Sequence, residues 1–331
     1  MERFALAAAV VLGFALTAAL CSLFVPLRRV LERREQQQQP VQSEQPRPAP
    51  LRAPLWGGLC AAAGTVAPVG GGWLAACVGQ PELLGSEGRL MTRLLTALAG
   101  SLAFGAVGLA EDVARMRSPA ALGLRRDVRL LLEALAAAFV LLLLRAAGCL
   151  PRGLGVPGAG YVLLGSAVPF LWAVLMVALA ECARIAEQDE GAVCGAAFVA
   201  MLALMMVEAG LGVSGLAVLP AALAGALVAL GLWAFPPARL GVGCCGSLLA
   251  AGAIGCIPLS LDMTSLTVPL ALPFWAAGGL LAAQLLCAKR TGKPLRCWVK
   301  KHKMSPETVF LCSFALSAVG YVLALALLRW C

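Results

Sequence analysis

Residues 212–234 read GVSGLAVLPAALAGALVALGLWA and contain no charged side chain. A helix of about 20 such residues crosses the hydrocarbon core of a bilayer, so this stretch predicts a membrane span. Further apolar stretches of similar length lie on both sides of it, at 4–26, 55–78, 91–110, 128–149, 159–180, 191–209, 246–264, 267–288 and 307–329. We therefore expect an all-α, polytopic membrane protein with about ten transmembrane helices.

The composition of the whole chain excludes a soluble fold. Of its 331 residues, 61% are hydrophobic and 13% are charged, whereas soluble domains have about 45–50% and 25%. The mean hydropathy is +0.88. The same figures exclude a disordered chain and a disulfide-rich secreted fold. Most of the 13 cysteines, such as Cys21 and Cys312, sit singly in apolar runs, where a thiol behaves as a small hydrophobe.

The basic residues predict the orientation in the membrane. All but six of the 26 Lys and Arg residues fall in or beside the loops 27–54, 111–128, 181–190, 235–245 and 289–306. The positive-inside rule places these loops in the cytoplasm and both termini outside. The net charge of +9 is then explained by this bias and by contact with anionic lipid, and nucleic acid is not an expected partner.

The chain divides into three parts. Residues 1–34 form the first transmembrane helix and a basic stop that contains Arg28, Arg29, Arg33 and Arg34. Residues 35–53, EQQQQPVQSEQPRPAPLRA, have no apolar period and predict a flexible cytoplasmic linker. Residues 54–331 form a domain of nine transmembrane helices.

Acidic residues lie at the cytoplasmic ends of the predicted spans, at Glu111, Asp112, Glu181, Glu187, Asp189 and Glu190. Acidic groups are rare near lipid and often mark functional sites. One interpretation is a cation or magnesium-diphosphate site on the inner face. The other is a set of solvated loop acids beside Arg115, Arg117 and Arg184.

Two glycine-containing loops each have one functional and one purely structural interpretation. Residues 241–247, GVGCCGS, open the eighth span, where backbone amides can hold phosphate or can simply begin a helix. Thr291-Gly292-Lys293-Pro294 lies in the basic loop 289–303. This loop binds phosphate or acidic lipid headgroups, or it only obeys the positive-inside rule.

These features recur as short motifs in a fixed order. They are Pro54-Leu55-Trp56-Gly57-Gly58, Gly108-Leu109-Ala110-Glu111-Asp112, Gly123-Leu124 with Arg129 and Glu133, the loop ECARIAEQDEGA at 181–192, Pro237 to Ser247, and Thr291-Gly292-Lys293. Their order and spacing resemble the polyprenyl-phosphate N-acetylhexosamine-1-phosphate transferases (glycosyltransferase family 4), most closely the MraY type, phospho-N-acetylmuramoyl-pentapeptide transferase. The resemblance implies ten spans in the cytoplasmic (inner) membrane, with the active site on cytoplasmic loops.

The resemblance also assigns roles to individual positions. It implies catalytic positions at Glu111, Asp112, Glu187, Glu190 and Cys244, with Asp112 and Cys244 at the metal. It implies substrate-binding positions at Gly57, Gly58, Arg129, Glu181, Arg184, Gly243, Gly246, Ser247, Lys293 and His302. Several residue types depart from the family pattern. Cys244 stands in place of a metal-binding Asp, Glu181 and Arg184 in place of two Asn, and His302 in place of a triple-His motif.

These departures favour one of three possible functions. In the family, Mg²⁺ bridges the diphosphate of a UDP-sugar, a lipid phosphate attacks, and UMP leaves. Mg²⁺ prefers oxygen ligands to a thiol, and a catalytic carboxylate tolerates little displacement. The favoured prediction is therefore a pseudoenzyme or regulatory paralogue in peptidoglycan or polysaccharide lipid-intermediate synthesis, without a metal cofactor.

Two other functions stay open. One is an active Mg²⁺-dependent transferase that moves a phospho-sugar from a UDP-sugar to undecaprenyl phosphate with release of UMP. The other is an unrelated transporter or lipid-handling scaffold. For the family-type functions the expected partners are membrane lipids, polyprenyl phosphate, a UDP-sugar and other enzymes of cell-wall synthesis.

Overall fold

A computed structural model describes residues 2–38, 56–79, 88–117, 123–151, 153–156, 160–163, 165, 167–187, 191–213, 215–235, 239–291 and 306–330. Within these ranges the framework consists of ten helices of at least 17 residues. They are α1 (Glu2–Gln38), α2 (Gly57–Gly79), α4 (Gly88–Arg117), α5 (Arg126–Ala146), α6 (Ala167–Ala186), α7 (Ala192–Gly210), α8 (Val218–Ala234), α9 (Gly243–Ser260), α11 (Leu272–Thr291) and α13 (Pro306–Trp330).

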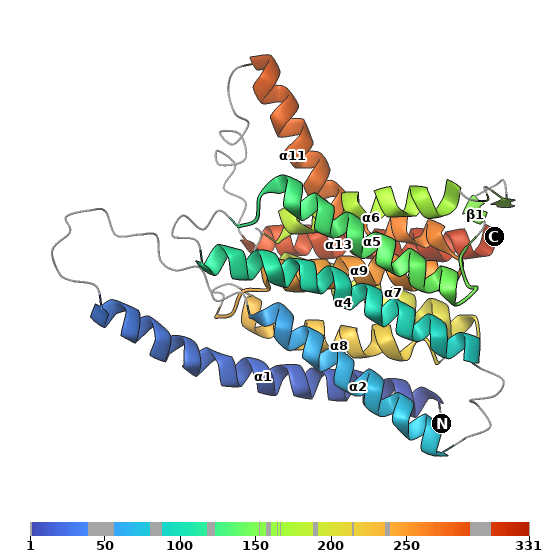
Figure 1. The fold of residues 1–331 in the computed structure, drawn as a ribbon, viewed down its shortest axis with the longest axis horizontal. Coiled ribbons are helices and arrows are strands. Elements are labelled where there is room, and N and C mark those ends of the chain that lie inside the picture. Colours follow the sequence, from blue (N-terminus) through green and yellow to red (C-terminus); the bar gives the residue numbers. More distant parts are fainter. Residues whose placement is uncertain are drawn as a thin grey trace.

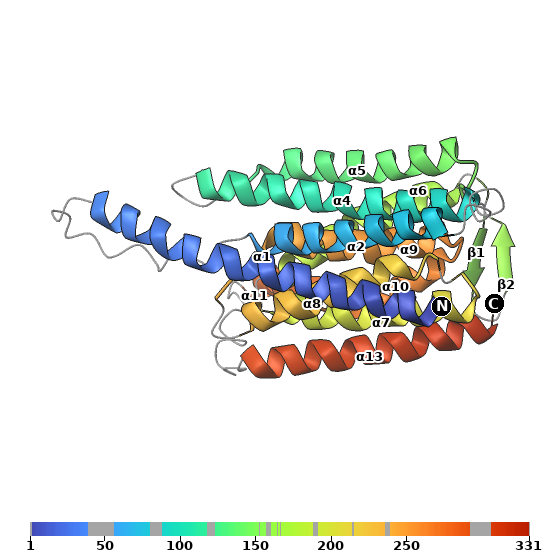
Figure 2. The same ribbon diagram turned by 90° about the horizontal axis from the view of Figure 1, so that it is seen from below.

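Most of the long helices lie side by side in one bundle with α9 at its centre, whereas α11 rises steeply away from the others (Figure 1, Figure 2). Every residue of α9 is buried. It packs mainly against α4, while α1 packs mainly against α8. The first two turns of α9, GCCGSLLA, contain mostly small side chains, which allow neighbouring backbones to approach closely in a membrane protein. The centre of the bundle is therefore built from small residues.

Each predicted apolar stretch overlaps one of the ten long helices, which confirms a helical, multi-pass membrane fold. Six helices of the described chain are long and apolar enough to cross a membrane: Leu6–Pro26, Leu90–Arg117, Ala167–Ala186, Ala192–Gly210, Gly243–Ser260 and Glu307–Leu327. The apolar helix α8 has only 17 residues. The charged side chains of α5 include Asp127 and Glu133. Six spans are therefore supported directly, and the expected ten are not.

The predicted span 159–180 begins too early. A β-hairpin precedes its helix, in which β1 (Gly153–Val156) pairs antiparallel with β2 (Gly160–Leu163), and α6 begins only at Ala167. The sequence of this region contains Gly at 153, 155, 158 and 160, which disfavours a helix. The fold is therefore all-α apart from this short hairpin.

The predicted span 267–288 is also not a single straight helix. The short helices η1 (Thr264–Leu266) and α10 (Thr267–Leu270) meet α11 with a bend of 64°. Pro269 lies just before the bend and Pro273 just after it. Proline has no N–H to donate and clashes with the preceding turn, so two prolines here break the helix.

Different helix termini lie at the two ends of the bundle. The helix α1 begins, and α13 ends, at the same end of the bundle (Figure 1, Figure 2). At the opposite end α4 and α6 finish and α5 and α9 begin, and we call this the polar end.

The helix α1 continues to Gln38, so residues 35–38 of the predicted linker are helical. The rest of that linker lies outside the described residues.

Candidate functional site

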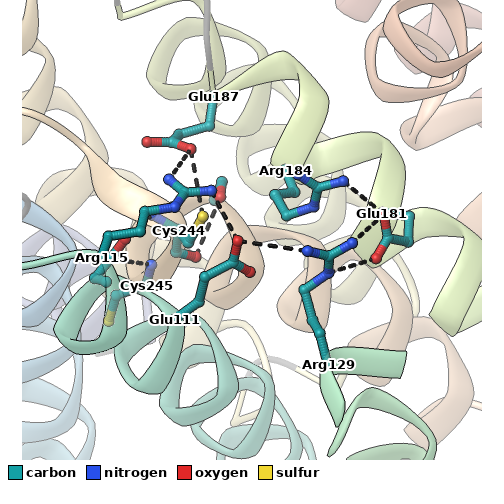
Figure 3. Close-up of polar contacts among 10 residues, drawn as sticks. Glu111, Arg115, Arg129, Glu181, Arg184, Glu187, Cys244 and Cys245 are labelled. Carbon is teal, nitrogen blue, oxygen red and sulfur yellow. Dashed lines mark hydrogen bonds and ion pairs between the residues drawn. The ribbon is translucent and has the colours of Figure 1, made fainter. Parts of the chain in front are cut away.

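The predicted site residues of four helices meet at the polar end of the bundle (Figure 3). The pair Glu111 and Asp112 lies six and five residues before the end of α4. Arg129 belongs to the first turn of α5, and Glu181 and Arg184 to the last turns of α6. Glu187 follows α6 directly, and Cys244 and Cys245 lie in the first turn of α9.

Asp112 fixes the beginning of α9. Its Oδ1 accepts the backbone N–H of Cys244 at 3.0 Å, and its Oδ2 accepts that of Cys245 at 2.9 Å. The residue is 1% exposed. The first N–H groups of a helix have no partner within the helix, and a carboxylate there also complements the helix dipole. Asp112 therefore caps α9 from a neighbouring helix.

Glycines allow this close approach. Gly243 has φ of +72°, a conformation that a side chain disfavours, and it turns the chain into α9. A Cβ on Gly108 would collide with the carbonyl group of Cys244. The Gly108 position, one turn before Asp112 on α4, is therefore needed to bring the Asp112 carboxylate against the α9 amides.

Arg115 connects this cap to the end of α6. Its Nη2 donates to Glu111 Oε1 at 2.8 Å, and its Nη1 donates to Glu187 Oε2 at 3.3 Å. The thiol of Cys244 donates to the same Glu187 oxygen, at 3.3 Å. A carboxylate, a guanidinium and a thiol thus close the space above the beginning of α9 (Figure 3).

A second group of ion pairs joins α5 to α6. Arg129 holds Glu181 with two hydrogen bonds, from Nε at 2.7 Å and from Nη2 at 3.3 Å. Arg184 donates to Glu181 Oε2 at 2.8 Å. Arg129 Nη1 also lies 3.6 Å from Glu111 Oε1, which links the two groups. Each of these arginines is therefore paired with a carboxylate of the chain itself.

Comparison with known proteins places this region in a family. The sequence model of glycosyl transferase family 4 matches residues 94–262, from α4 to just past the end of α9. The chain belongs to glycosyl transferase family 4. No curated protein matches the chain.

The family match covers all of the site described above, including the α4 acids, Arg129, the end of α6 and the beginning of α9. It supports a lipid-linked sugar-phosphate transferase fold. An unrelated transporter or scaffold, the third of the alternatives raised by the sequence, is thereby set aside. The MraY type is consistent with this match.

The predicted substrate-binding glycines of this family member make backbone contacts. The N–H of Gly57 donates to the carbonyl of Gly241 at 3.2 Å. A Cβ on Gly58 would collide with Gly246 N and with Cys245. These contacts lock the first turn of α2 against the beginning of α9. They show what the glycines do for packing, and binding of substrate by these positions stays a prediction.

The remaining predicted residues fall into two groups. Ser247 is fully buried, and its hydroxyl donates to the carbonyl of Cys244 at 3.1 Å, so this hydroxyl serves α9 itself. Glu190, Lys293 and His302 lie outside the described residues.

Two members of the site were absent from the predicted set. Arg115 is one, and its spacing of four residues from Glu111 is the usual signal of a helical ion pair. Glu133 is the other. It is fully buried on α5, and neither carboxylate oxygen has a hydrogen-bond partner in the described part of the protein. It interacts electrostatically with Glu111, Arg129, Glu181 and Arg184.

The groups around Asp112 do not fit a magnesium ion. Both Asp112 oxygens accept backbone N–H groups. The adjacent predicted ligand is the Cys244 thiol, a soft ligand that a hard cation disfavours. In the described ranges no three His, Cys, Asp or Glu side chains are placed to hold a metal ion. We therefore assign no step to a bound metal.

Proposed function

We propose that this member of glycosyl transferase family 4 is an MraY-like binding or regulatory paralogue without sugar-phosphate transfer. The observation that carries the proposal is the closed set of ion pairs at the polar end. Arg115, Arg129 and Arg184 each pair with a carboxylate of the chain. Phosphoryl transfer is achieved almost entirely by positioned charge around the phosphates, and here that charge is neutralised internally.

The residue types at the beginning of α9 support the same proposal. Cys244 presents a thiol at the position where the family resemblance implies a metal-binding carboxylate. The thiol donates a hydrogen bond to Glu187 and supplies no hard oxygen ligand. A single change of this kind can be compensated, but residues that act as one catalytic unit are strongly non-additive. We expect loss of transfer rather than a graded reduction.

Binding of a phosphate-bearing ligand can outlast transfer. It needs positive charge and hydrogen-bond donors, and not a metal ion of fixed geometry. The side chains of Arg115 and Arg184 are each 19% exposed, so a ligand can reach them. We propose polyprenyl phosphate or a UDP-sugar as the ligand, and other enzymes of cell-envelope synthesis as the partners.

The proposal includes ten spans in the cytoplasmic (inner) membrane, with the polar end inside and both termini outside. Support comes from the basic loops and from α1 and α13, whose outer ends lie at the same end of the bundle (Figure 2). Reporter fusions within 181–190 and within 235–245 should report the cytoplasm, whereas fusions at the hairpin 153–163 should report the outside. An outside report from 181–190 would contradict this topology.

The alternative is an active transferase, favoured by one observation. The carboxylates of Glu111 and Glu187 both contact Arg115, beside the buried Asp112, so acidic oxygens do gather at the polar end. One assay separates the two functions. Purified protein is supplied with UDP-N-acetylmuramoyl-pentapeptide, undecaprenyl phosphate and Mg²⁺, and UMP is measured. We expect no UMP above the background. Mg²⁺-dependent turnover would establish the active transferase.

A further inference from the structure

Glu187 holds an unusual place in the site. Its backbone N–H donates to the carbonyl of Ala183 at 3.0 Å, so its main chain still belongs to the last turn of α6. Its carboxylate points back over the beginning of α9, toward Arg115 and Cys244 (Figure 3). The side chain can therefore leave this position by rotation alone, without unwinding α6.

Among the carboxylates of the site, Glu187 is the one whose shortest contact is longest. Its two contacts, to Arg115 and to Cys244, are both 3.3 Å. By contrast, Glu111 accepts from Arg115 at 2.8 Å, and Glu181 accepts from Arg129 at 2.7 Å. The 3.3 Å bond from the guanidinium is longer than the usual 2.7–3.2 Å range for N–H···O bonds, and the other bond comes from a thiol, which is a weak donor. Glu187 is therefore the group that a competing anion displaces most easily.

The competition for Arg115 also favours displacement. Glu187 shares Arg115 with Glu111, and Glu111 has the shorter contact, 2.8 Å against 3.3 Å. A guanidinium has five N–H donors, and it binds phosphate oxygens in the same fork geometry as carboxylate oxygens. An anionic group of a ligand at Arg115 therefore competes for the place that the Glu187 carboxylate now occupies.

We propose that Glu187 is an autoinhibitory carboxylate, an internal stand-in for a phosphate group that must rotate away before a phosphate-bearing ligand binds Arg115. This inference rests on the proposed retention of ligand binding. It adds that in the resting protein the Glu187 carboxylate occupies the place of the ligand at Arg115. The chemistry at Arg115 is the same for a lipid phosphate and for a soluble diphosphate, and experiment distinguishes these sources.

The test compares the full-length wild type with Glu187→Gln. In one arm, inorganic pyrophosphate is titrated into protein in phosphatidylcholine nanodiscs at low salt. In the other arm, phosphatidic acid is titrated into protein in neutral detergent. Glu187→Gln removes the competing charge, so binding should tighten by about fivefold in at least one arm, the size expected of a partly exposed ion pair. The arm that responds identifies the source of the phosphate.

Three further variants control for overall charge, for the role of Arg115 and for folding. Glu307 is exposed at the beginning of α13, at the polar end of the bundle, and Glu307→Gln removes one negative charge without touching Arg115. It should leave both affinities unchanged. Arg115→Gln in the Glu187→Gln background should abolish the gain. Glu187→Asp retains the charge, so it should bind no tighter than the wild type and serves if Glu187→Gln folds poorly.

The outcomes separate this inference from the function on which it rests. Equal binding by wild type and Glu187→Gln, or an equal gain from Glu307→Gln, would overturn the autoinhibitory role and leave the binding function standing. No binding of either probe by any variant would overturn the inference together with the retained binding. A gain that disappears with Arg115→Gln establishes the inference.

Discussion

The two halves of the candidate site are held together in different ways. In the first half, Asp112 binds the backbone N–H groups of Cys244 and Cys245. In the second half, Arg129 and Arg184 bind the side chain of Glu181. A backbone N–H is supplied by every residue except proline, whereas an ion pair requires two matched side chains. The contacts of the first half therefore do not depend on the side chain at 244. The contacts of the second half depend on the side chains of Arg129, Arg184 and Glu181.

This difference shows which contacts of the fold tolerate a change of side chain. A Cys at 244 leaves the Asp112 cap intact, because the cap uses only the main chain. An Arg at 184, where the family resemblance implies Asn, brings a charge that is matched by Glu181, where the resemblance implies a second Asn. The contact between α4 and α9 thus holds the bundle together whatever the side chain at 244. Glu181 and Arg184 form an ion pair where the resemblance implies two neutral amides.

The largest effect is expected at the cap. Asp112→Ala leaves two buried N–H groups without their acceptor, and each such loss is costly. We expect the free energy of unfolding to fall by about 2–4 kcal/mol, measured by denaturation in mixed micelles. Asp127→Ala is the control, because Asp127 is exposed in the first turn of α5, and it should lose less than about 1 kcal/mol. Equal losses in the two variants would contradict the capping role.

A smaller effect is expected in the arginine half. Glu181→Gln leaves the guanidinium groups of Arg129 and Arg184 without their shared counter-charge. Arg129 is buried, whereas Glu181 and Arg184 are partly exposed. We expect a loss of about 1–2 kcal/mol. Adding Arg184→Gln should recover part of it, because residues in one network are coupled by about 0.5–3 kcal/mol. Strictly additive losses would show that the pair is not coupled.

The smallest effect is expected at Glu133, behind the arginine half. Neither of its carboxylate oxygens has a hydrogen-bond partner among the described residues, and its side chain is fully buried. Burial of an unpaired carboxylate is unfavourable. Glu133→Gln keeps the shape and removes the charge, so stability should stay the same or rise by up to about 1 kcal/mol. A loss of more than about 2 kcal/mol would mean that the carboxylate has a stabilising partner.

Hydropathy alone located the helices well, because a membrane span is a long apolar run. It failed where local backbone chemistry overrides composition. Residues 160–163 are apolar but form a strand, since the neighbouring glycines disfavour a helix. Pro269 and Pro273 bend what composition presents as one span. Hydropathy also gave no sign that Arg129 and Glu133 of α5 are buried beside the site.

The site was predictable as a set of positions and not as a set of contacts. The structure brings together seven of the positions that the motifs marked, namely Glu111, Asp112, Arg129, Glu181, Arg184, Glu187 and Cys244. It did not show that Asp112 binds the main chain of α9, because a motif carries no information on backbone donors. The helical spacing of Glu111 and Arg115 is the usual signal of an ion pair, although the predicted set did not include Arg115. Glu133 shows that a charged residue inside a predicted span can be buried beside the site.

The most direct test of the account is whether the wild-type protein binds Mg²⁺ at all, since this measurement needs no knowledge of the substrate. The free energy of unfolding is measured in EDTA and in millimolar Mg²⁺, for the wild type and for Cys244→Asp. A ligand at 100 times its dissociation constant stabilises a protein by about 2.7 kcal/mol. We predict no stabilisation of the wild type, and no UMP release from Cys244→Asp, because the other replaced residues remain. Stabilisation of the wild type by about 2–3 kcal/mol in millimolar Mg²⁺ would contradict the account.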